Sequence, residues 1–326
     1  MKLVITIPAL NEEQTLPKTL ADLPKTVHGF DQVEWLLVDD GSEDRTSQVA
    51  REAGVQHIVR HPQRRGLAEA FSTALDAALR IGADVIVNTD ADNQYSASSI
   101  EELVRPIVAG RADIVVGQRV GRGVAAFSRS KKTLQRLGSA VVRTASATQI
   151  PDTTSGFRAY SREAALRLNV LGQYTYTLES LIQAGRSGLS VISLPVETNP
   201  ATRRSRLFSS TPEYVVRSAA QIIRAYAMYE PLRTFLYLAA VAFIGGSTIF
   251  VRFFVYFVSG NGTGHVQSLI LGAVLMMVAF QLTVLGILAD LLAANRKLLE
   301  RVLFRIRSAE ALQEQADLQL TSNPRP

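Results

Sequence analysis

Two long segments near the C-terminus carry almost no charge, and they restrict the fold more than any other feature of the chain. No charged residue lies between positions 234 and 251, and from 253 to 289 only His265 can carry a charge. A polar stretch at 259–264 separates two apolar segments, 235–258 and 266–289. Each is long enough to cross about 30 Å of hydrocarbon as a helix. We therefore predict two transmembrane helices, with a buried helical hairpin of a soluble protein as the alternative.

The distribution of basic residues predicts how these helices are oriented. Arg233 precedes the first segment, the linker holds no Lys or Arg, and the second segment is followed by Arg296, Lys297, Arg301, Arg305 and Arg307. Basic residues remain on the cytoplasmic side of a membrane. We therefore expect a multi-pass protein of the cell inner (plasma) membrane with both termini in the cytoplasm. Arg252 lies near the far end of its segment, where its side chain can reach the interface. The apolar run 1–8 is too short for a secretory signal.

The first 200 or so residues alternate between strand-like and helix-like patterns. Short runs rich in Val, Ile and Leu occur at 2–7, 35–38, 55–59, 85–89, 114–117 and 191–196, and helical patterns occur at 13–23, 46–53, 67–81 and 100–109. This order predicts an α/β domain with a mainly parallel sheet and helices on both faces. In such sheets, ligands bind at the carboxyl ends of the strands.

Polar residues follow three of the predicted strands. Asp90 and Asp92 come directly after the run 85–89, Asp39 and Asp40 end another, and the polar segment 8–13 ends the first. Two carboxylates with this spacing can share a divalent cation such as Mg²⁺ or Mn²⁺, which leaves positions open for phosphate oxygens. A solvated Asx turn is the alternative for Asp90 and Asp92. The chain has no P-loop and no G-x-G-x-x-G after a strand, which argues against an NTPase or a nicotinamide enzyme.

The net charge of +6 is concentrated in two basic clusters, and the chain contains no cysteine. The first cluster spans 119–143 without an acidic residue, and the second is Arg203-Arg204-Ser-Arg206. Such clusters suit phosphates or an anionic lipid surface. Nucleic acid is not an expected partner, because aromatic stacking residues are not interleaved with the basic ones. The absence of cysteine excludes disulfides and thiolate metal sites.

Taken together, these motifs resemble the family 2 nucleotide-sugar glycosyltransferases of GT-A fold, a Rossmann-like fold. Within them the chain is most similar to the polyprenyl-phosphate glycosyltransferases, which include dolichyl-phosphate mannose synthase. The resemblance rests on segments 7–13, 38–42, 90–94, 152–160 and 176–180, and the paired apolar segments extend it. One departure is segment 199–206, which only loosely matches the family's basic loop ending in Ser-Lys.

The resemblance also implies roles for individual residues. It implies that Asp39 or Asp40 meets the base or ribose, and that Asp90 and Asp92 hold the metal with Gln94 as a further ligand. The nucleotide and sugar site would be formed by Pro8, Asn11, Glu12, Asp39, Asp40, Asp90, Gly156 and Glu179. From the residues alone, Asn11 can equally cap a helix, Gly156 can permit a tight turn, and Asp152 can cap the turn before Thr153.

Sugar transfer develops negative charge on the leaving phosphates, which a metal and an arginine can stabilise. Arg119 is our first candidate for a donor or acceptor phosphate ligand and Arg136 the second, and solvated surface residues are the alternative for both. Arg203 and Arg206 are further candidates for the acceptor phosphate. A lipid phosphate has its second pKa near 6, so most of it is already an oxyanion at neutral pH. A strong base is then unnecessary, and Asp152 is either a base or a ligand for a sugar hydroxyl.

We therefore expect a metal-dependent inverting enzyme that moves one hexose from a UDP- or GDP-sugar to a polyprenyl phosphate at the cytoplasmic membrane face. A processive polysaccharide synthase and a non-catalytic nucleotide-binding scaffold are the alternatives. The synthase is disfavoured because the sole tryptophan, Trp35, lies outside any Gln-x-x-Arg-Trp segment. The predicted parts are a GT-A domain at 1–210, an interfacial amphipathic helix at 211–231 (a core-packing helix is the alternative), a transmembrane hairpin at 232–292 and a cytoplasmic tail at 293–326. Gly245 and Gly246 could allow close helix packing in a homo-oligomer.

Overall fold

The computed structural model describes residues 1–119, 150–170, 176–199, 230–260 and 266–322. The chain divides into two compact units, Met1–Ile222 with Val302–Pro326, and Ile223–Arg301. Arg136, Arg203 and Arg206 lie outside the described residues, as does the predicted interfacial helix 211–231 except for its last two residues.

The first unit is built on a seven-stranded sheet with the strand order β3-β2-β1-β4-β6-β5-β7. The strands are β1 (Lys2–Ala9), β2 (Gln32–Asp39), β3 (His57–Arg60), β4 (Val85–Asn88), β5 (Ile114–Arg119), β6 (Arg158–Ser161) and β7 (Val191–Val196). Only β6 runs antiparallel to its neighbours, β4 and β5. The predicted mainly parallel sheet is therefore confirmed.

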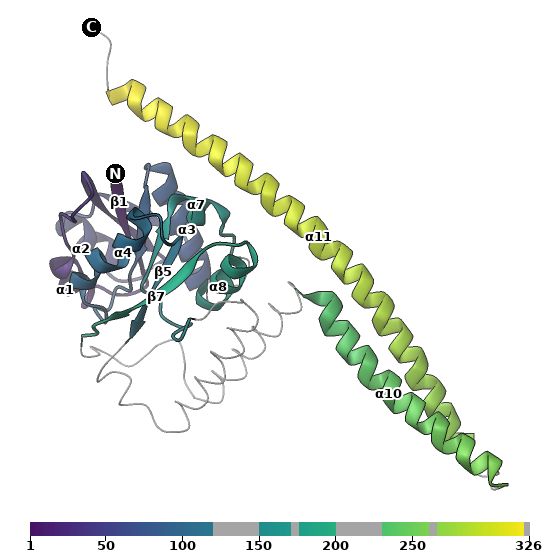
Figure 1. Cartoon of the computed structure of the whole chain (residues 1–326). Helices are drawn as coiled ribbons and strands as arrows, with labels where there is room; N and C mark the ends of the chain where they lie inside the picture. Colours follow the sequence, from purple (N-terminus) through teal and green to yellow (C-terminus); the bar gives the residue numbers. More distant parts are fainter. Residues whose placement is uncertain (120–149, 171–175, 200–229, 261–265, 323–326) are drawn as a thin grey trace. The chain divides into compact units, whose positions relative to one another are not determined.

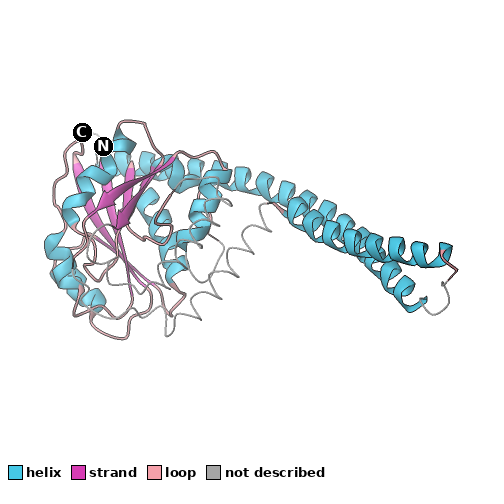
Figure 2. Ribbon diagram, turned by 60° about the horizontal axis from the view of Figure 1, so that its bottom comes forward, coloured by secondary structure: helices cyan, strands magenta, loops and turns pink. Residues whose placement is uncertain are grey.

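Helices cover both faces of this sheet, as predicted (Figures 1 and 2). They are α1 (Leu16–Asp22), α2 (Thr46–Glu52), α3 (Leu67–Arg80), α4 (Ile100–Val108), α7 (Arg162–Arg167) and α8 (Tyr176–Arg186), with a 3₁₀ turn at Ala97–Ser99. Successive side chains of a strand point to opposite faces. In β1, Leu3 and Ile5 accordingly join the core that includes α1 and α4, whereas Val4 joins the core that includes α3, α7 and α8.

The parallel pairing brings the polar strand ends to one edge of the sheet. Ala9 of β1 pairs with Asp39 of β2, and Asp39 pairs with Arg60 of β3. On the other side of β1, Thr6 pairs with Asn88, the last residue of β4. The loops after β1, β2 and β4 therefore leave the sheet at the same edge, where the sequence places its acidic motifs.

The second unit holds two long apolar helices, as predicted, and the second of these continues from Val302 into the first unit. Helix α10 spans Pro231–Val258, and α11 spans Val266–Ser322, 57 residues without a break. Their apolar parts have mean hydropathies of 2.0 and 2.3, so both are long and apolar enough to cross a membrane. The helices approach closely at Gly246, where an added Cβ would lie 3.1 Å from the carbonyl oxygen of Gly272. Helix α11 continues past the predicted span 266–289 because no Gly or Pro follows Gly286 until Pro324.

Candidate active site

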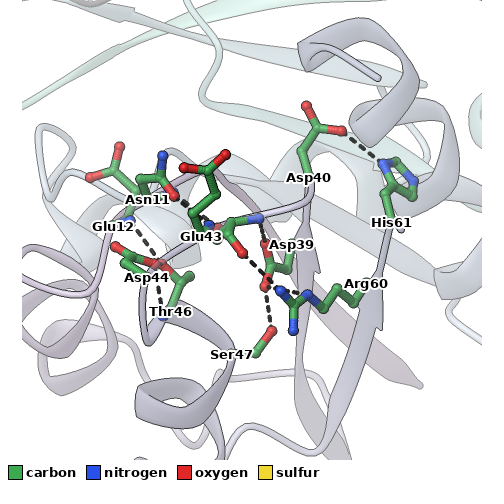
Figure 3. A network of polar contacts seen from close by, with 11 residues as sticks. Asn11, Glu12, Asp39, Asp40, Glu43, Asp44, Thr46, Ser47, Arg60 and His61 are labelled. Atoms are coloured by element: carbon green, nitrogen blue, oxygen red, sulfur yellow. Dashed lines mark hydrogen bonds and ion pairs between the residues drawn. The ribbon is translucent and has the colours of Figure 1, made fainter. Parts of the chain in front are cut away.

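The loops after β1 and β2 are joined by hydrogen bonds of Asn11 and Glu12 (Figure 3). Asn11 has a left-handed backbone with φ of 55°, and its Oδ1 accepts the N–H of Glu43 at 2.8 Å. The N–H of Asn11 donates to Ser42 Oγ at 2.9 Å, and that of Glu12 donates to Thr46 Oγ1 at 2.8 Å. Asn and Asp tolerate this conformation better than other non-glycine residues. These contacts fix the two loops relative to one another, and Pro8 lies just before them, buried in β1.

Asp39 holds the turn that follows β2. Its side chain is fully buried, and Oδ1 accepts the N–H of Ser42 at 2.7 Å. Oδ2 accepts a hydrogen bond from Ser47 and lies 3.6 Å from Nε of Arg60. Arg60 also donates to the carbonyl of Ser42 at 2.8 Å. The carboxylate of Asp39 thus shapes the loop from inside rather than facing solvent.

Asp40 contacts His61 (Figure 3) and joins β2 to the segment that begins α3. Its Oδ1 lies 2.8 Å from Nδ1 of His61 and accepts the N–H of Arg65 at 2.8 Å. Oδ2 accepts the N–H of Gly66 at 2.8 Å. His61 is also buried, and its Nε2 lies 3.0 Å from Thr73 Oγ1. A carboxylate offers about four acceptor sites, so Asp40 retains capacity for one further donor. Sequence reasoning missed His61, although its position directly after β3 could have indicated a role.

Asp90, Asp92 and Gln94 lie in the loop that follows β4. The three side chains are partly exposed, and Asp92 Oδ1 accepts the backbone N–H of Gln94 at 3.2 Å. Asn93, which has a φ of 55°, gives the loop its bend. The loop is held by Thr19, which donates to the carbonyl of Ala91 at 2.9 Å, and by Asn199, whose side chain donates to the carbonyl of Asn93 at 3.1 Å.

The donor set of this loop fits a hard divalent cation. Within the described ranges no group of three His, Cys, Asp or Glu residues could hold a metal. The candidate ligands are therefore two carboxylates and the amide oxygen of Gln94. Mg²⁺ and Mn²⁺ favour oxygen ligands, and Mg²⁺ usually keeps several positions for water and substrate phosphates.

Gly156 lies directly against Asp90. A Cβ at position 156 would lie 3.1 and 3.3 Å from the two carboxylate oxygens of Asp90 and 2.9 Å from Oη of Tyr176. Tyr176 donates to the carbonyl of Gly156 at 3.1 Å, and the amide of Asn88 donates to the Tyr176 oxygen at 2.8 Å. Phe71 stacks on the Tyr176 ring with 3.9 Å between centroids. Position 156 needs glycine because the carboxylate and the phenol occupy the space of a side chain.

Arg119 and Asp152 form a two-point ion pair beside this loop. Nε of Arg119 donates to Oδ2 at 2.8 Å, and Nη2 donates to Oδ1 at 2.9 Å. Nη2 also donates to Thr154 Oγ1 at 2.7 Å. Arg119 ends β5, and Asp152 belongs to the loop before β6, so the antiparallel pairing of these strands brings them together. Nη1 of Arg119 makes no hydrogen bond with another described residue.

The ion pair and its surroundings shift several pKa values. Burial alone would raise the pKa of Asp152, but the hydrogen bonds and charge of Arg119 lower it below its usual range. Burial opposes the charge of Arg119, yet Asp152, Tyr95 and Asp90 raise its pKa. Burial and the nearby charge of Asp90 raise the pKa of Tyr95 to about 12. Asp152 is therefore held as a carboxylate of low basicity, and Arg119 as a fixed cation.

Two further residues, Arg158 and Tyr95, were not predicted from the sequence and support the loop that holds Asp152 and Gly156. Arg158 is fully buried and donates to the carbonyls of Ser155 and Thr153 at 2.8 and 3.0 Å and to Ser180 Oγ at 2.8 Å. Tyr95 accepts the N–H of Gly156 at 3.3 Å, and its ring stacks on Phe157. An aromatic residue directly after Gln94 was a signal for Tyr95, whereas no sequence signal distinguished Arg158. Glu179, a predicted site residue, is buried in the first turn of α8.

The mostly parallel sheet with helices on both faces is the GT-A-like fold that the sequence predicts. The chain belongs to glycosyl transferase family 2, because the sequence model of that family matches residues 4–168. This match contains the loops after β1, β2 and β4, the Arg119–Asp152 pair and Gly156.

Two curated relatives are similar to this chain over more than half of its length. The dolichyl-phosphate hexose transferase of Haloferax volcanii is 32% identical over 199 residues, which are 60% of this chain and 81% of the relative. The polyprenol monophosphomannose synthase of Mycolicibacterium smegmatis is 28% identical over 204 residues, 59% of this chain and 76% of the relative.

Solved structures share this fold as well. Glucosyl-3-phosphoglycerate synthase of Mycobacterium tuberculosis, crystallised with Mn²⁺, UDP-glucose and phosphoglyceric acid, aligns with a TM-score of 0.55 and 21% identity. The alignment covers 69% of this chain and 78% of the other. At this identity the likeness establishes the fold alone.

Proposed function

We propose that this protein transfers one hexose from a UDP- or GDP-sugar to a polyprenyl phosphate, with inversion at the anomeric carbon. The observation that carries this proposal is that Asp90 lies directly against Gly156. Gly156 belongs to the same loop as Asp152, and it therefore connects the acidic pair Asp90 and Asp92 with the Arg119–Asp152 ion pair. One edge of the sheet thus offers a site for a donor diphosphate and, beside it, a fixed cation for a second phosphate. The relatives named for polyprenol and dolichyl-phosphate transfer support this choice of acceptor.

The donor nucleotide would lie over the loops after β1 and β2. Asn11 and Glu12 hold these loops together, and Asp39 and Asp40 brace them through internal hydrogen bonds. Because Asp39 is fully buried, it would act by shaping the nucleotide pocket, whereas Asp40 can still accept one donor from a base or ribose. Glu179 and Gly156 would face the sugar.

Asp90, Asp92 and Gln94 would hold one Mg²⁺ or Mn²⁺ ion, which stabilises the charge that develops on the leaving diphosphate. The structural relative was crystallised with Mn²⁺ and UDP-glucose, which supports a divalent cation as the cofactor. The contact with Gly156 keeps the Asp90 carboxylate beside the loop of Asp152 and Arg119.

Arg119 would bind the phosphate of the lipid acceptor and orient its oxygen for in-line attack on the anomeric carbon. Its raised pKa keeps the cation at every working pH. The lipid phosphate is mostly an oxyanion at neutral pH, so no residue has to remove a proton. The lowered pKa of Asp152 fits this chemistry, because a weak base can position Arg119 and a sugar hydroxyl. Arg136, Arg203 and Arg206 are proposed as further acceptor-phosphate ligands.

Helices α10 and α11 would anchor the enzyme in the inner membrane, where polyprenyl phosphates reside. The basic residues after the second apolar segment favour a catalytic domain and both termini on the cytoplasmic side. The acceptor would then approach from the bilayer and the nucleotide-sugar from the cytoplasm.

A transfer assay with purified full-length protein tests this proposal. The protein is incubated with Mn²⁺ or Mg²⁺, a panel of UDP- and GDP-sugars, and three acceptors: a short polyprenyl phosphate, the matching polyprenol and inorganic phosphate. Mass spectrometry of the lipid fraction should find one hexose on the polyprenyl phosphate from one donor, and none on the polyprenol. Nucleotide release without a lipid product would retain a donor site but reject the lipid acceptor.

A further inference from the structure

Helix α11 carries an exposed stripe with the spacing of a coiled coil. Its members alternate three and four residues apart: Leu285, Leu288, Leu292, Asn295, Leu299, Val302 and Ile306. The apolar members are 49% to 69% exposed in the single chain. Steps that alternate between three and four residues average 3.5 residues. This is the spacing of the residues that form the contact line between two helices of a coiled coil. We call these seven residues the heptad stripe.

Five of the seven residues of the heptad stripe lie beyond the predicted membrane span 266–289. From Leu292 to Ile306 the helix extends about 21 Å at 1.5 Å per residue. Arg296, Lys297 and Arg301 flank this part, so it belongs to an aqueous or headgroup environment rather than to hydrocarbon. Contiguous apolar side chains of this extent mark an interaction surface.

The opposite side of the same helix already has partners in its own unit. Phe304 lies under the guanidinium of Arg167, which is 5.4 Å from the ring centroid. Arg307 donates to the carbonyl of Leu168 at 2.9 Å and lies 3.4 Å from Asp76. In the heptad, Phe304 is on the side away from the stripe. The stripe is therefore the side of this helix segment that remains for a further partner.

Three features favour a second copy of this chain as that partner. Helices anchored in one membrane with the same orientation run parallel, so identical residues can meet across a two-fold axis. Asn295 then meets Asn295 of the other copy and exchanges amide hydrogen bonds, whereas an apolar partner would leave its amide unsatisfied. Arg305 and Glu310 flank the seam five residues apart, the spacing at which opposite charges pair between parallel strands. Neither forms an ion pair with another described residue.

We propose that two copies of this protein pair through a parallel coiled coil formed by the heptad stripe of α11. The pairing is independent of which sugar or lipid the enzyme uses, although its parallel direction rests on the proposed membrane insertion. Paired α11 helices would hold two catalytic units at the same membrane patch.

Disulfide cross-linking tests the pairing directly, because the chain contains no cysteine. Val302→Cys places a thiol at a core position of the stripe, where the Cα atoms of two copies come within the range for a disulfide. Lys297→Cys places one on the opposite side and serves as the matched control, since both positions are exposed. The full-length variants are oxidised in membranes and separated without reductant. We expect at least fivefold more covalent dimer from Val302→Cys. Equal yields, or no dimer from either variant, would overturn the proposal.

Light scattering in detergent distinguishes a second copy from other occupants of the stripe. The wild-type protein should have the mass of a dimer or a multiple of it. Leu299→Asp combined with Ile306→Asp should give monomers that still show the native circular dichroism spectrum, and Lys297→Asp should leave the mass unchanged. A monomeric wild-type protein would assign the stripe to lipid or to another protein and contradict the proposal.

Discussion

Arg119 and Asp152 are joined at two points, with 2.8 Å between Nε and Oδ2 and 2.9 Å between Nη2 and Oδ1. A partly buried pair of this geometry fixes both charges, since each lowers the free energy of the other's ionised form. In the proposed function, Arg119 would offer this fixed cation to a phosphate. The lowered pKa of Asp152 makes it a weak base, which favours the proposed role as a ligand over the role as a base.

The pH dependence of transfer should report the acceptor phosphate rather than Asp152. The pKa of Asp152 is lowered, so the carboxylate is already ionised above about pH 5. The rate should rise between about pH 5 and 7 as the lipid phosphate loses its second proton, near pH 6. Asp152→Asn should reduce kcat by about tenfold to a hundredfold because Arg119 loses its orientation, but the limb near pH 6 should remain. Disappearance of that limb in Asp152→Asn would identify Asp152 as the base.

The same pair contributes to stability with a defined sign. A carboxylate whose pKa is lower in the folded state stabilises the fold above its unfolded pKa, near 3.9. That contribution is lost as the pH falls through the folded value. We therefore expect wild type to lose more of its thermal stability than Asp152→Asn between pH 5 and pH 3. The buried Trp35 of β2 provides the fluorescence signal for both proteins.

Gly156→Ala should weaken metal binding. Its Cβ would lie 3.1 and 3.3 Å from the oxygens of Asp90 and 2.9 Å from the Tyr176 hydroxyl, so these groups must move. We expect an increase of about tenfold in the Kd for Mn²⁺, measured by titration with UDP present, and a similar fall in kcat/KM. Gly156→Ala combined with Tyr176→Phe removes the closest clash and should recover part of the affinity. Unchanged Mn²⁺ affinity in Gly156→Ala would show that Gly156 does not position Asp90.

His61→Phe should destabilise the domain and weaken nucleotide binding together. His61 contacts both Asp40 and Thr73, and its loss leaves a buried carboxylate with one partner fewer. Such a loss costs about 1 to 3 kcal/mol. Trp35 fluorescence during urea unfolding should show this decrease, and the KM for the nucleotide-sugar should rise several-fold because Asp40 braces the start of α3. His57→Phe, at the other end of β3, is the control and should leave the nucleotide KM unchanged.

Much of the fold was predictable because apolar runs and turn residues are local signals. The six strand patterns and the helices on both faces of the sheet were confirmed, but β6 was missed. Its sequence, Arg-Ala-Tyr-Ser, lacks an apolar run, and its strand character comes from pairing with β4 and β5. Helix α11 also continues to Ser322, through most of the segment 293–326, which was predicted only as a cytoplasmic tail.

The residues of the candidate site could be named from sequence motifs, but the contacts among them could not. Asp39, Asp40, Asp90, Asp92 and Gly156 can be named from short local patterns. Their partners cannot, because they arrive from distant parts of the chain: His61 reaches Asp40, and Tyr176 reaches Gly156. The bond between Arg119 and Asp152 likewise depends on the pairing of β5 with β6, which no single motif encodes.

The most direct test of the account is lipid-linked sugar formation by wild type and Asp92→Asn in one assay. Both purified proteins receive the preferred nucleotide-sugar, Mn²⁺ and polyprenyl phosphate, and the lipid product is counted by mass spectrometry. We expect one hexose per lipid phosphate from wild type. We expect at least a hundredfold less product from Asp92→Asn, whose Trp35 fluorescence and thermal unfolding remain native. Product at the wild-type rate from Asp92→Asn, or a polymer of sugars from wild type, would contradict it.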